Sequence, residues 1–543
     1  MQLWAMTKAH DAVIIGGGHN GLVCAFYLAR AGLKVRILEA RDIIGGACVT
    51  EDFAPGFRNS TASYTVSLLR PKVIADMRLA DHGYRVIERP ISNFFPLAGD
   101  FLKLGGGTAR TQSEFARFSP RDAAAFPAFE AALERVADLL RGLSLKSPPG
   151  TGISGVLAAA MQGRPLLGMA LEAQRDVLEL FTKSAREFLD GWFESDVVKA
   201  AFGFDSVVGN FASPDTPGSA YVLLHHVFGE VNGKRGAWGH CVGGMGTITQ
   251  AMAAVCAAAG VEISLEARVE KLLVSGGKAV GVRLASGQEI AAKIVAANIG
   301  PALLFRKIVD PGDLPADFNR RIAGYRTGSG SFRMNVALSE LPDFSVLPGT
   351  ACAEHHQAGI IIAPSLDYMD RAFTDAKAHG WSKAPIVEMK LPSTVDASLA
   401  PAGAHVASLF CQQFAPQLPG GRSWDDEREA AADDVIATVT AHSPNFARSI
   451  IARQIHSPLD LERKFGLIGG DIFHGRMSLD QLWAARPVLG AGDYRSPIAG
   501  LYQCGSGTHP GGGVTGAPGH NAAHAILADR SLATRWRARR RSG

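Results

Sequence analysis

Three glycines near the start of the chain have the spacing of a nucleotide-binding turn. Gly16, Gly18 and Gly21 fit the pattern G-x-G-x-x-G. In such a turn the first glycine permits the tight bend, the second lets backbone N–H groups approach a pyrophosphate, and the third lets the next helix pack closely on the strand. Glu39 follows at the distance where a carboxylate can bond a ribose diol. The predicted dinucleotide site consists of Gly16, Gly18, Asn20, Gly21, Glu39, Ala40 and Arg41.

The segments around this turn have the pattern that such a site needs. Val13 to Ile15 form a short β-branched run, which is typical of a buried parallel strand. Residues 22–31 predict the helix that follows the turn, with its positive N-terminal end directed at phosphate. Residues 34–38 predict the second strand. Strand, turn, helix, strand and acid therefore arrive within about 30 residues, the context that separates a nucleotide site from a simple loop.

Two further glycine-rich segments are expected to approach the same ligand. Gly45 and Gly46, followed by the small Ala47, let the backbone pass close to it. Residues 511–516 also spell G-x-G-x-x-G, but they begin well past a strand and no later strand carries a ribose-binding acid. We therefore predict that residues 505–513 form a second wall around the first ligand.

The helix after this second glycine loop favours one particular dinucleotide. Thr515 is expected to cap that helix. The positive end of the helix suits the negative charge that a reduced flavin develops at N1 and O2. No second complete unit is present for NAD(P)H. The sequence thus predicts FAD bound across one discontinuous fold.

The composition of the chain limits which other functions are expected. The chain has 543 residues, of which 47% are hydrophobic and 20% are charged, as in a globular protein of two or three subdomains. A net charge of +4 gives no case for nucleic acid. Seven scattered cysteines without C-x-x-C suit a reducing, intracellular compartment, either a bacterial cytoplasm or a mitochondrial matrix. We expect no metal, because the pairs His225-His226 and His355-His356 have poor geometry for sharing one.

The order of predicted elements indicates an α/β fold. We expect a discontinuous, Rossmann-like FAD-binding domain with an inserted mixed-sheet substrate domain and a helical cap. The predicted parts are FAD-binding segments 1–75, 236–304 and 490–530, substrate-domain strands 76–118, the helical cap 119–235, the substrate domain 305–489 and a basic tail 531–543.

Two segments allow more than one interpretation. Residues 155–161 and 165–171 are unusually apolar and could line a greasy tunnel or rest on a membrane surface, although ordinary core is the simpler interpretation. The basic run from Arg535 to Arg541 could touch anionic lipid or nucleic acid, although a solvated tail is the simpler interpretation.

The motifs resemble those of the phytoene desaturase-like flavoproteins, which are relatives of carotenoid desaturases and amine oxidases. A more detailed match is to the pyridine nucleotide-disulfide oxidoreductase domain-containing protein two group, and it runs from about residue 10 to residue 530. The C-x-x-C of true disulfide reductases is missing. The segments that carry the resemblance are 13–21, 45–46, 219–226, 236–239, 243–246, 474–481 and 505–521.

This resemblance implies roles for individual residues around FAD. Glu39 would hold the adenosine ribose, and the backbone of Val269 would contact adenine. Carotenoid desaturases carry an acidic residue where this chain has Cys504-Gly-Ser-Gly, which puts the ribityl contact there in doubt. Gly16, Gly18 and Gly21 would hold the pyrophosphate, Gly46 and Ala47 would lie along the ribityl chain, Gly45 belongs to the same cofactor-binding segment, and Gly505, Gly513, Val514 and Thr515 would border the phosphates and flavin.

The predicted activity follows from the cofactor and the resemblance. We expect an FAD-dependent oxidoreductase that dehydrogenates or desaturates a small apolar substrate, of polyene or isoprenoid type, by hydride transfer to flavin N5. No catalytic side chain is assigned; His474, Arg486 and His509 are candidates because they lie in family-like motifs. Two alternatives stay open: an FAD-bearing regulatory protein with little turnover, for which the resemblance implies a respiratory-chain partner, and an amine-oxidase-like flavoenzyme. The sequence leaves the oligomeric state open.

Overall fold

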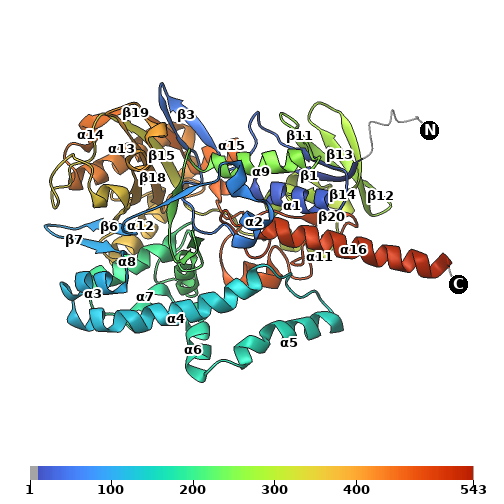
Figure 1. Cartoon of the computed structure of the whole chain (residues 1–543), viewed down its shortest axis with the longest axis horizontal. Coiled ribbons are helices and arrows are strands. Elements are labelled where there is room, and N and C mark those ends of the chain that lie inside the picture. The colour runs from blue at the N-terminus through green and yellow to red at the C-terminus, as the bar shows by residue number, and fades with distance from the viewer. Residues whose placement is uncertain (1–9, 542–543) are drawn as a thin grey trace.

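The protein consists of two sheet domains side by side with a layer of helices along one edge (Figure 1). The computed structural model describes residues 10–541, apart from the side chains of Ser154, His225, His226 and those beyond Ser531. The nucleotide domain lies at the right of Figure 1, the second sheet domain at the left, and the helical layer below.

The nucleotide domain is built on a seven-stranded sheet whose strands come from distant parts of the sequence. Its order is β11-β2-β1-β14-β13-β12, and β20 pairs with β14. The pairs β11–β2, β2–β1, β1–β14 and β14–β20 are parallel, whereas β12 and β13 form an antiparallel extension. This arrangement confirms the predicted discontinuous Rossmann-like fold. The strands are β1 (His10–Ile15), β2 (Val35–Leu38), β11 (Glu262–Ser264), β12 (Val269–Ser275), β13 (Lys278–Leu284), β14 (Glu289–Ala297) and β20 (Leu501–Gln503).

Helix α1 (His19–Arg30) contacts both α9 (Gly246–Ala258) and α16 (Ala517–Arg541) against this sheet. The approach of α16 is close, because a Cβ built at Gly519 would lie 2.1 Å from the backbone oxygen of Asn20. The beginning, middle and end of the chain are thus packed into one core.

The second domain contains a seven-stranded sheet of order β19-β15-β18-β17-β16-β6-β7. Every residue of β15 and β17 is buried, as expected for strands covered on both faces. Helices α12 (Leu366–His379) and α13 (Trp424–His442) pack in this domain. The strands are β6 (Asn93–Pro96), β7 (Phe101–Leu104), β15 (Phe332–Leu338), β16 (Gly359–Ile362), β17 (Ile386–Lys390), β18 (His405–Gln412) and β19 (Ile450–His456).

The chain passes between the domains later than residue 305. Phe305, Phe318 and Tyr325 belong to the core of the nucleotide domain, and the second sheet begins with β15. The smaller elements are β3 (Thr50–Ala54), β4 (Phe57–Ser60), β5 (Val86–Glu88), β8 (Glu230–Val231), β9 (Lys234–Arg235), β10 (Gly239–Cys241), α2 (Pro71–Asp76), α10 (Pro301–Leu303), α11 (Ala316–Ala323), α14 (Phe446–Ser449) and α15 (Pro458–Phe465).

The helical layer begins where the sequence indicates a helix start. Ser119 precedes α4, and its Oγ accepts a hydrogen bond of 3.1 Å from the backbone N–H of Asp122. A cluster of aromatic side chains, including Phe115 and Phe129, holds the layer together. Its helices are α3 (Thr108–Ala116), α4 (Pro120–Ser144), α5 (Ile153–Leu167), α6 (Leu171–Thr182), α7 (Ala185–Asp190) and α8 (Asp196–Val207).

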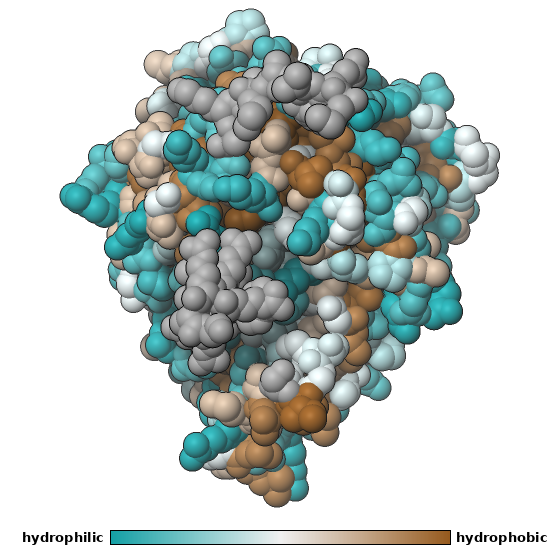
Figure 2. All heavy atoms as spheres, turned by 90° about the vertical axis from the view of Figure 1, so that its right-hand side faces the viewer, coloured by the Kyte–Doolittle hydropathy of each residue, from teal (hydrophilic) through white to brown (hydrophobic). Residues whose placement is uncertain are grey.

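Helix α5 extends away from the body of the protein and exposes apolar side chains. Ile153 is 85% exposed, Met161 77% and Leu167 78%. Figure 1 shows α5 as the lowest right-hand helix, and Figure 2 shows hydrophobic residues gathered at the lower end of the molecule. The interpretation of residues 155–171 as ordinary core is therefore wrong. We call the exposed residues Ile153, Val156, Leu157, Met161, Leu167, Leu171 and Leu178 the apolar face.

Two observations concern membranes. Within residues 10–541, no helix is long and apolar enough to cross one. The side chains of the basic run from Arg535 to Arg541 lie outside the described residues, so the two interpretations of the tail stay predictions.

Candidate active site

The glycine turn after β1 leaves the first backbone N–H groups of α1 available to an anion. Gly16 has φ +92°, which favours glycine, and Gly18 is the N-cap residue of α1 without a side-chain cap. A Cβ at Gly21 would lie 2.4 Å from the backbone oxygen of Gly16 and 2.8 Å from Nδ2 of Asn298. The turn therefore needs glycine for packing, and its open helix end suits a pyrophosphate.

Glu39 is fixed at the end of β2 by two backbone groups. Its Oε2 accepts a hydrogen bond of 2.8 Å from the N–H of Gly17, and its Oε1 accepts one of 2.9 Å from the N–H of Arg41. The side chain is buried. These bonds hold the carboxylate beside the glycine turn, where the sequence predicts a ribose contact.

A cavity of about 570 Å³, which we call the dinucleotide cavity, follows this turn. Asn20, Gly21, Gly45 and Gly505 of the predicted set do not line it but support its wall. Asn20 Nδ2 donates to Ser506 Oγ at 3.1 Å, and the N–H of Gly45 donates to the oxygen of Gly17 at 3.0 Å. The predicted residues that line the cavity are Gly16, Gly18, Glu39, Ala40, Arg41, Gly46, Ala47 and Val269.

A second, central cavity of about 140 Å³ adjoins the first. The two share Ala47, His474 and Ser506 among their lining residues. Gly513 and Val514 of the predicted set also line it. Its far wall includes Lys390 of β17 and Phe410 of β18, together with Tyr64 and Trp238 from the segments before β5 and β10.

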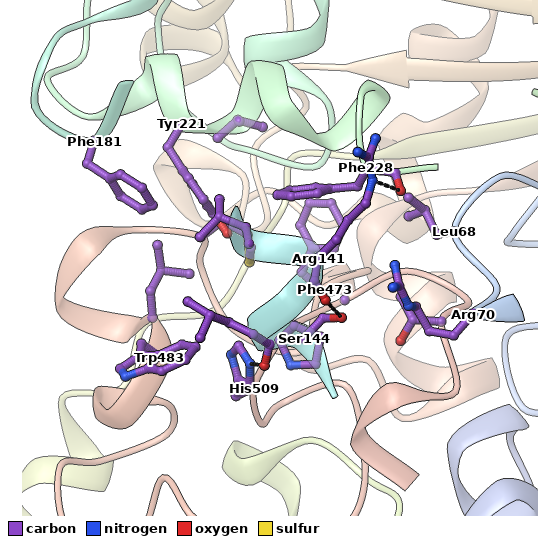
Figure 3. Close-up of a pocket in the computed structure, with 18 residues that line it drawn as sticks. Leu68, Arg70, Arg141, Ser144, Phe181, Tyr221, Phe228, Phe473, Trp483 and His509 are labelled. Atoms are coloured by element: carbon purple, nitrogen blue, oxygen red, sulfur yellow. Dashed lines mark hydrogen bonds between the residues drawn. The ribbon is translucent and has the colours of Figure 1, made fainter. Parts of the chain in front are cut away.

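A third cavity, of about 350 Å³, continues from the central cavity through the shared Leu68 and Phe473. We call it the apolar cavity; Figure 3 shows its walls, which come from α4, from the segment 219–228 and from the last loops. Thr515 and His509 of the predicted set line it. Its aromatic lining residues are Phe181, Tyr221, Phe228, Phe473 and Trp483.

The three catalytic candidates have different surroundings. His474 lines both the dinucleotide and the central cavity, and burial and the charge of Arg486 lower its pKa to about 4. Arg486 is fully buried and lines none of the three cavities. It donates to the backbone oxygens of Phe473, Gly475 and Ser506, so it holds two loops together.

His509 lies in the apolar cavity. Its Nε2 is 3.2 Å from the oxygen of Leu143, and its ring packs against that of Trp483 with centroids 4.5 Å apart. Burial lowers its pKa to about 4, so the ring is neutral at physiological pH.

A buried ionic cluster lies on the far wall, and it was not predicted from the sequence. Lys390 Nζ lies 2.9 Å from Glu388 Oε1, and Tyr64 Oη donates a hydrogen bond to the other carboxylate oxygen of Glu388. Arg333 stacks on the ring of Tyr64 at 4.5 Å, and Arg89 donates to Thr65 beside it at 2.7 Å.

These surroundings set the protonation of Lys390. Burial and the positive charge of Arg89 lower the pKa of Lys390 to about 7, although Glu388 acts in the opposite direction. A signal for the cluster exists in the sequence, because Ile386-Val-Glu-Met-Lys390 places two charges at alternate positions of a buried-looking strand.

Two chemistries are not supported in the part of the chain that the structure describes. No group of three or more His, Cys, Asp or Glu could hold a metal ion there. The seven cysteines are free, and all but Cys352 are buried.

The residues present fit a bound FAD. The glycine turn would meet the pyrophosphate, Glu39 and Val269 lie at one end of the dinucleotide cavity, and Ala47, His474 and Ser506 join that cavity to the central one. Fold and site together define the class of FAD-dependent oxidoreductases.

Comparisons with known proteins agree. The family model described as flavin containing amine oxidoreductase matches residues 21–332, and the chain belongs to this family. It is 42% identical to the pyridine nucleotide-disulfide oxidoreductase domain-containing protein 2 of Rattus norvegicus, covering 96% of this chain and 94% of that protein. It is 27% identical to a lycopene-forming phytoene desaturase of Pseudescherichia vulneris, covering 93% and 96%.

A solved structure of an oxidoreductase from Methanosarcina mazei shares the fold. The TM-score is 0.61 at 16% identity, with 95% of this chain and 99% of that chain covered. The predicted cofactor, FAD, and the predicted enzyme class, an oxidoreductase, are confirmed by the family.

Proposed function

We propose that this FAD-dependent oxidoreductase dehydrogenates an apolar substrate of polyene or isoprenoid type. The observation that carries the proposal is the continuity of the three cavities, because the dinucleotide cavity leads through the central cavity into one lined by aliphatic and aromatic side chains. Such a lining binds an apolar body and excludes water from it. The likeness to a phytoene desaturase supports the same substrate class.

When bound by the lining of the dinucleotide cavity, FAD would supply the acceptor for a hydride from one C–H bond of the substrate. A proton must leave the neighbouring carbon, and the electron pair of that C–H bond then forms the new C=C bond. Lys390 lines the central cavity, and its neutral amine accepts that proton. Glu388, at 2.9 Å, stabilises the resulting ammonium. The substrate thereby loses two hydrogens, one as the hydride and one as this proton.

Amine oxidation is the second candidate, and the description of the matching family favours it. Aromatic residues, Tyr64, Trp238 and Phe410, do line the central cavity. Lys390 Nζ, however, lies 4.5 Å from the ring centroid of Tyr64 and 5.7 Å from that of Trp238. Because the amine of Lys390 already lies against these rings, an ammonium substrate would have to displace it to reach them. We therefore place the apolar substrate first.

The test is a turnover assay with a quinone as acceptor and a panel of polyenes, isoprenoids and primary amines. Mass spectrometry of the products distinguishes the candidates. Loss of two hydrogens from a polyene or isoprenoid supports the proposal. Conversion of an amine to an aldehyde, with the apolar compounds untouched, would overturn it.

We further propose that the apolar face rests on a membrane surface, from which an apolar substrate reaches the site. Residues 153–178, which carry this face, have Arg164 and Arg175 against Glu172 and Asp176, so the exposed apolar area rather than net charge suits such a surface. The connection is short, because α5 joins α4 to α6, and the C-terminal ends of both helices line the apolar cavity. The respiratory-chain partner stays a prediction.

A further inference from the structure

One wall of the apolar cavity carries two guanidinium groups. Figure 3 shows Arg70 and Arg141 among its lining residues, with Arg70 on the side away from Trp483. Most of the other lining side chains are aliphatic or aromatic. A charge in such a wall is unfavourable unless it is paired with an opposite charge. An arginine that has no acidic partner in the protein could therefore be paired by a negative group of the ligand.

Arg141 is already paired. Its Nη1 lies 2.8 Å from Glu134 Oε1 and 2.8 Å from Asp138 Oδ1. Arg235 contacts the same two carboxylates, at 3.3 and 3.0 Å. Two arginines therefore balance two acids, and Arg141 brings no unmatched charge to the cavity.

Arg70 has no such partner. Its Nε is buried and has no hydrogen-bond partner in the described structure, and its guanidinium forms no ion pair within residues 10–541. Its backbone is fixed, because the N–H of Arg70 donates to the oxygen of Thr515 at 3.1 Å. Burial and the charge of Arg141 lower the pKa of Arg70, and the charge of Glu230 opposes them. The guanidinium still stays charged at physiological pH.

We propose that the substrate is an acid with an apolar body, and that Arg70 binds its carboxylate. A guanidinium matches a carboxylate with two parallel N–H···O bonds, and one unmatched positive charge calls for one negative charge. A carboxylate is favoured over a phosphate monoester, which carries close to two charges at neutral pH. This inference rests on the proposed function and names the substrate class of the same site.

The test uses cis-parinaric acid, a fluorescent polyene acid, and its methyl ester as probes of the holoprotein. We expect the acid to bind more tightly than the ester. Arg70→Gln should weaken binding of the acid about tenfold to a hundredfold, the range of a charge-assisted hydrogen bond, and should leave the ester unchanged. Arg70→Lys should retain part of the preference. Arg78→Gln removes an exposed arginine that pairs with Asp81 and lines none of the three cavities, and it should change nothing.

Three results would overturn the inference. The first is equal binding of acid and ester by the native protein. The second is tighter displacement of the probe by an alkyl phosphate than by an alkyl carboxylate, which would assign a phosphate head instead. The third is an altered flavin content or visible spectrum in Arg70→Gln, which would show that Arg70 contacts the cofactor. If the acid binds through Arg70 but is never dehydrogenated, the anion site stands and the proposed function fails.

Discussion

Glu388 and Lys390 lie two residues apart on the buried strand β17, and their side chains form an ion pair 2.9 Å long at the central cavity. The pair is enclosed by groups from other segments: Tyr64 and Arg89 precede the second sheet domain in sequence, and Arg333 lies on β15. Arg333 in turn is close to Cys411 of β18. Burial and the charges of Arg89 and Arg333, opposed by the carboxylate of Glu388, therefore hold the pKa of Lys390 at about 7.

Replacement of Lys390 should remove the proton acceptor. Lys390→Met is expected to lower turnover about 10²- to 10⁴-fold, the usual contribution of a general base, while FAD content is unchanged. Because the base must be neutral and its pKa is about 7, the native rate should rise through neutral pH and then level off. The residual rate of Lys390→Met should be flat over that range.

Glu388→Gln is the matched control for this assignment. Glu388 raises the pKa of Lys390, so its loss should shift the rising limb of the native profile to lower pH. Two results together would contradict the role of this pair. In Glu388→Gln the rise in rate would occur at the same pH as in the native protein, and in Lys390→Met the rate would still rise with pH.

Much of the nucleotide site could be predicted from the sequence, because its chemistry is local. The turn at Gly16, the strand before it and Glu39 at the end of β2 are set by short segments. The three-cavity path could not be predicted in this way. It joins Ala47, Lys390 and Trp483, and their distances depend on how the two sheet domains and the helical layer pack together.

That a residue lies in a family-like motif also does not tell whether its side chain supports the fold or faces the site. Arg486 and His474 belong to similar motifs, yet Arg486 binds backbone oxygens and His474 faces two cavities. The apolar stretch in α5 shows that composition alone also does not distinguish a buried helix from an exposed one. Its composition suits a core, but only the tertiary structure shows that Ile153 and Met161 have nothing packed over them in the described chain.

Addition of one methyl group at the glycine turn should abolish cofactor binding. In Gly21→Ala the new Cβ would lie 2.4 Å from the backbone oxygen of Gly16, so the turn must shift away from the pyrophosphate position. We expect purified Gly21→Ala to lose most of its flavin absorption. In Gly142→Ala, in helix α4, the new Cβ meets nothing within 4 Å. This control should keep its flavin and gain about 0.4–1 kcal/mol of stability. Full flavin content in Gly21→Ala would count against the assigned site.

Charge placed on the apolar face should weaken membrane binding. Leu157→Asp with Met161→Asp is expected to reduce co-sedimentation with lipid vesicles severalfold, because the exposed apolar area drives such binding. Ile451→Asp is the control, since Ile451 is 56% exposed on β19 in the second sheet domain. Equal sedimentation of both variants and the native protein would refute the membrane contact.

Acid should destabilise the protein through its buried histidines. His509 has a pKa of about 4 in the folded protein and an ordinary value of 6.5, so the unfolded chain binds more protons between these pH values. The free energy of unfolding should therefore fall as pH decreases from 6.5 to about 4, by up to about 1.4 kcal/mol per pH unit for each such group. Denaturant titrations of His509→Gln should show a shallower pH dependence. An identical slope would mean that His509 titrates normally.

If the substrate is apolar, it should reduce the bound flavin. Anaerobic titration of the purified holoprotein, followed by its visible flavin absorption, measures this electron transfer. We predict that polyene or isoprenoid compounds, and their acids above all, bleach the flavin, whereas NADH, NADPH, putrescine and cyclohexylamine do not. Bleaching by the amines alone, or by a nicotinamide alone, would contradict the account.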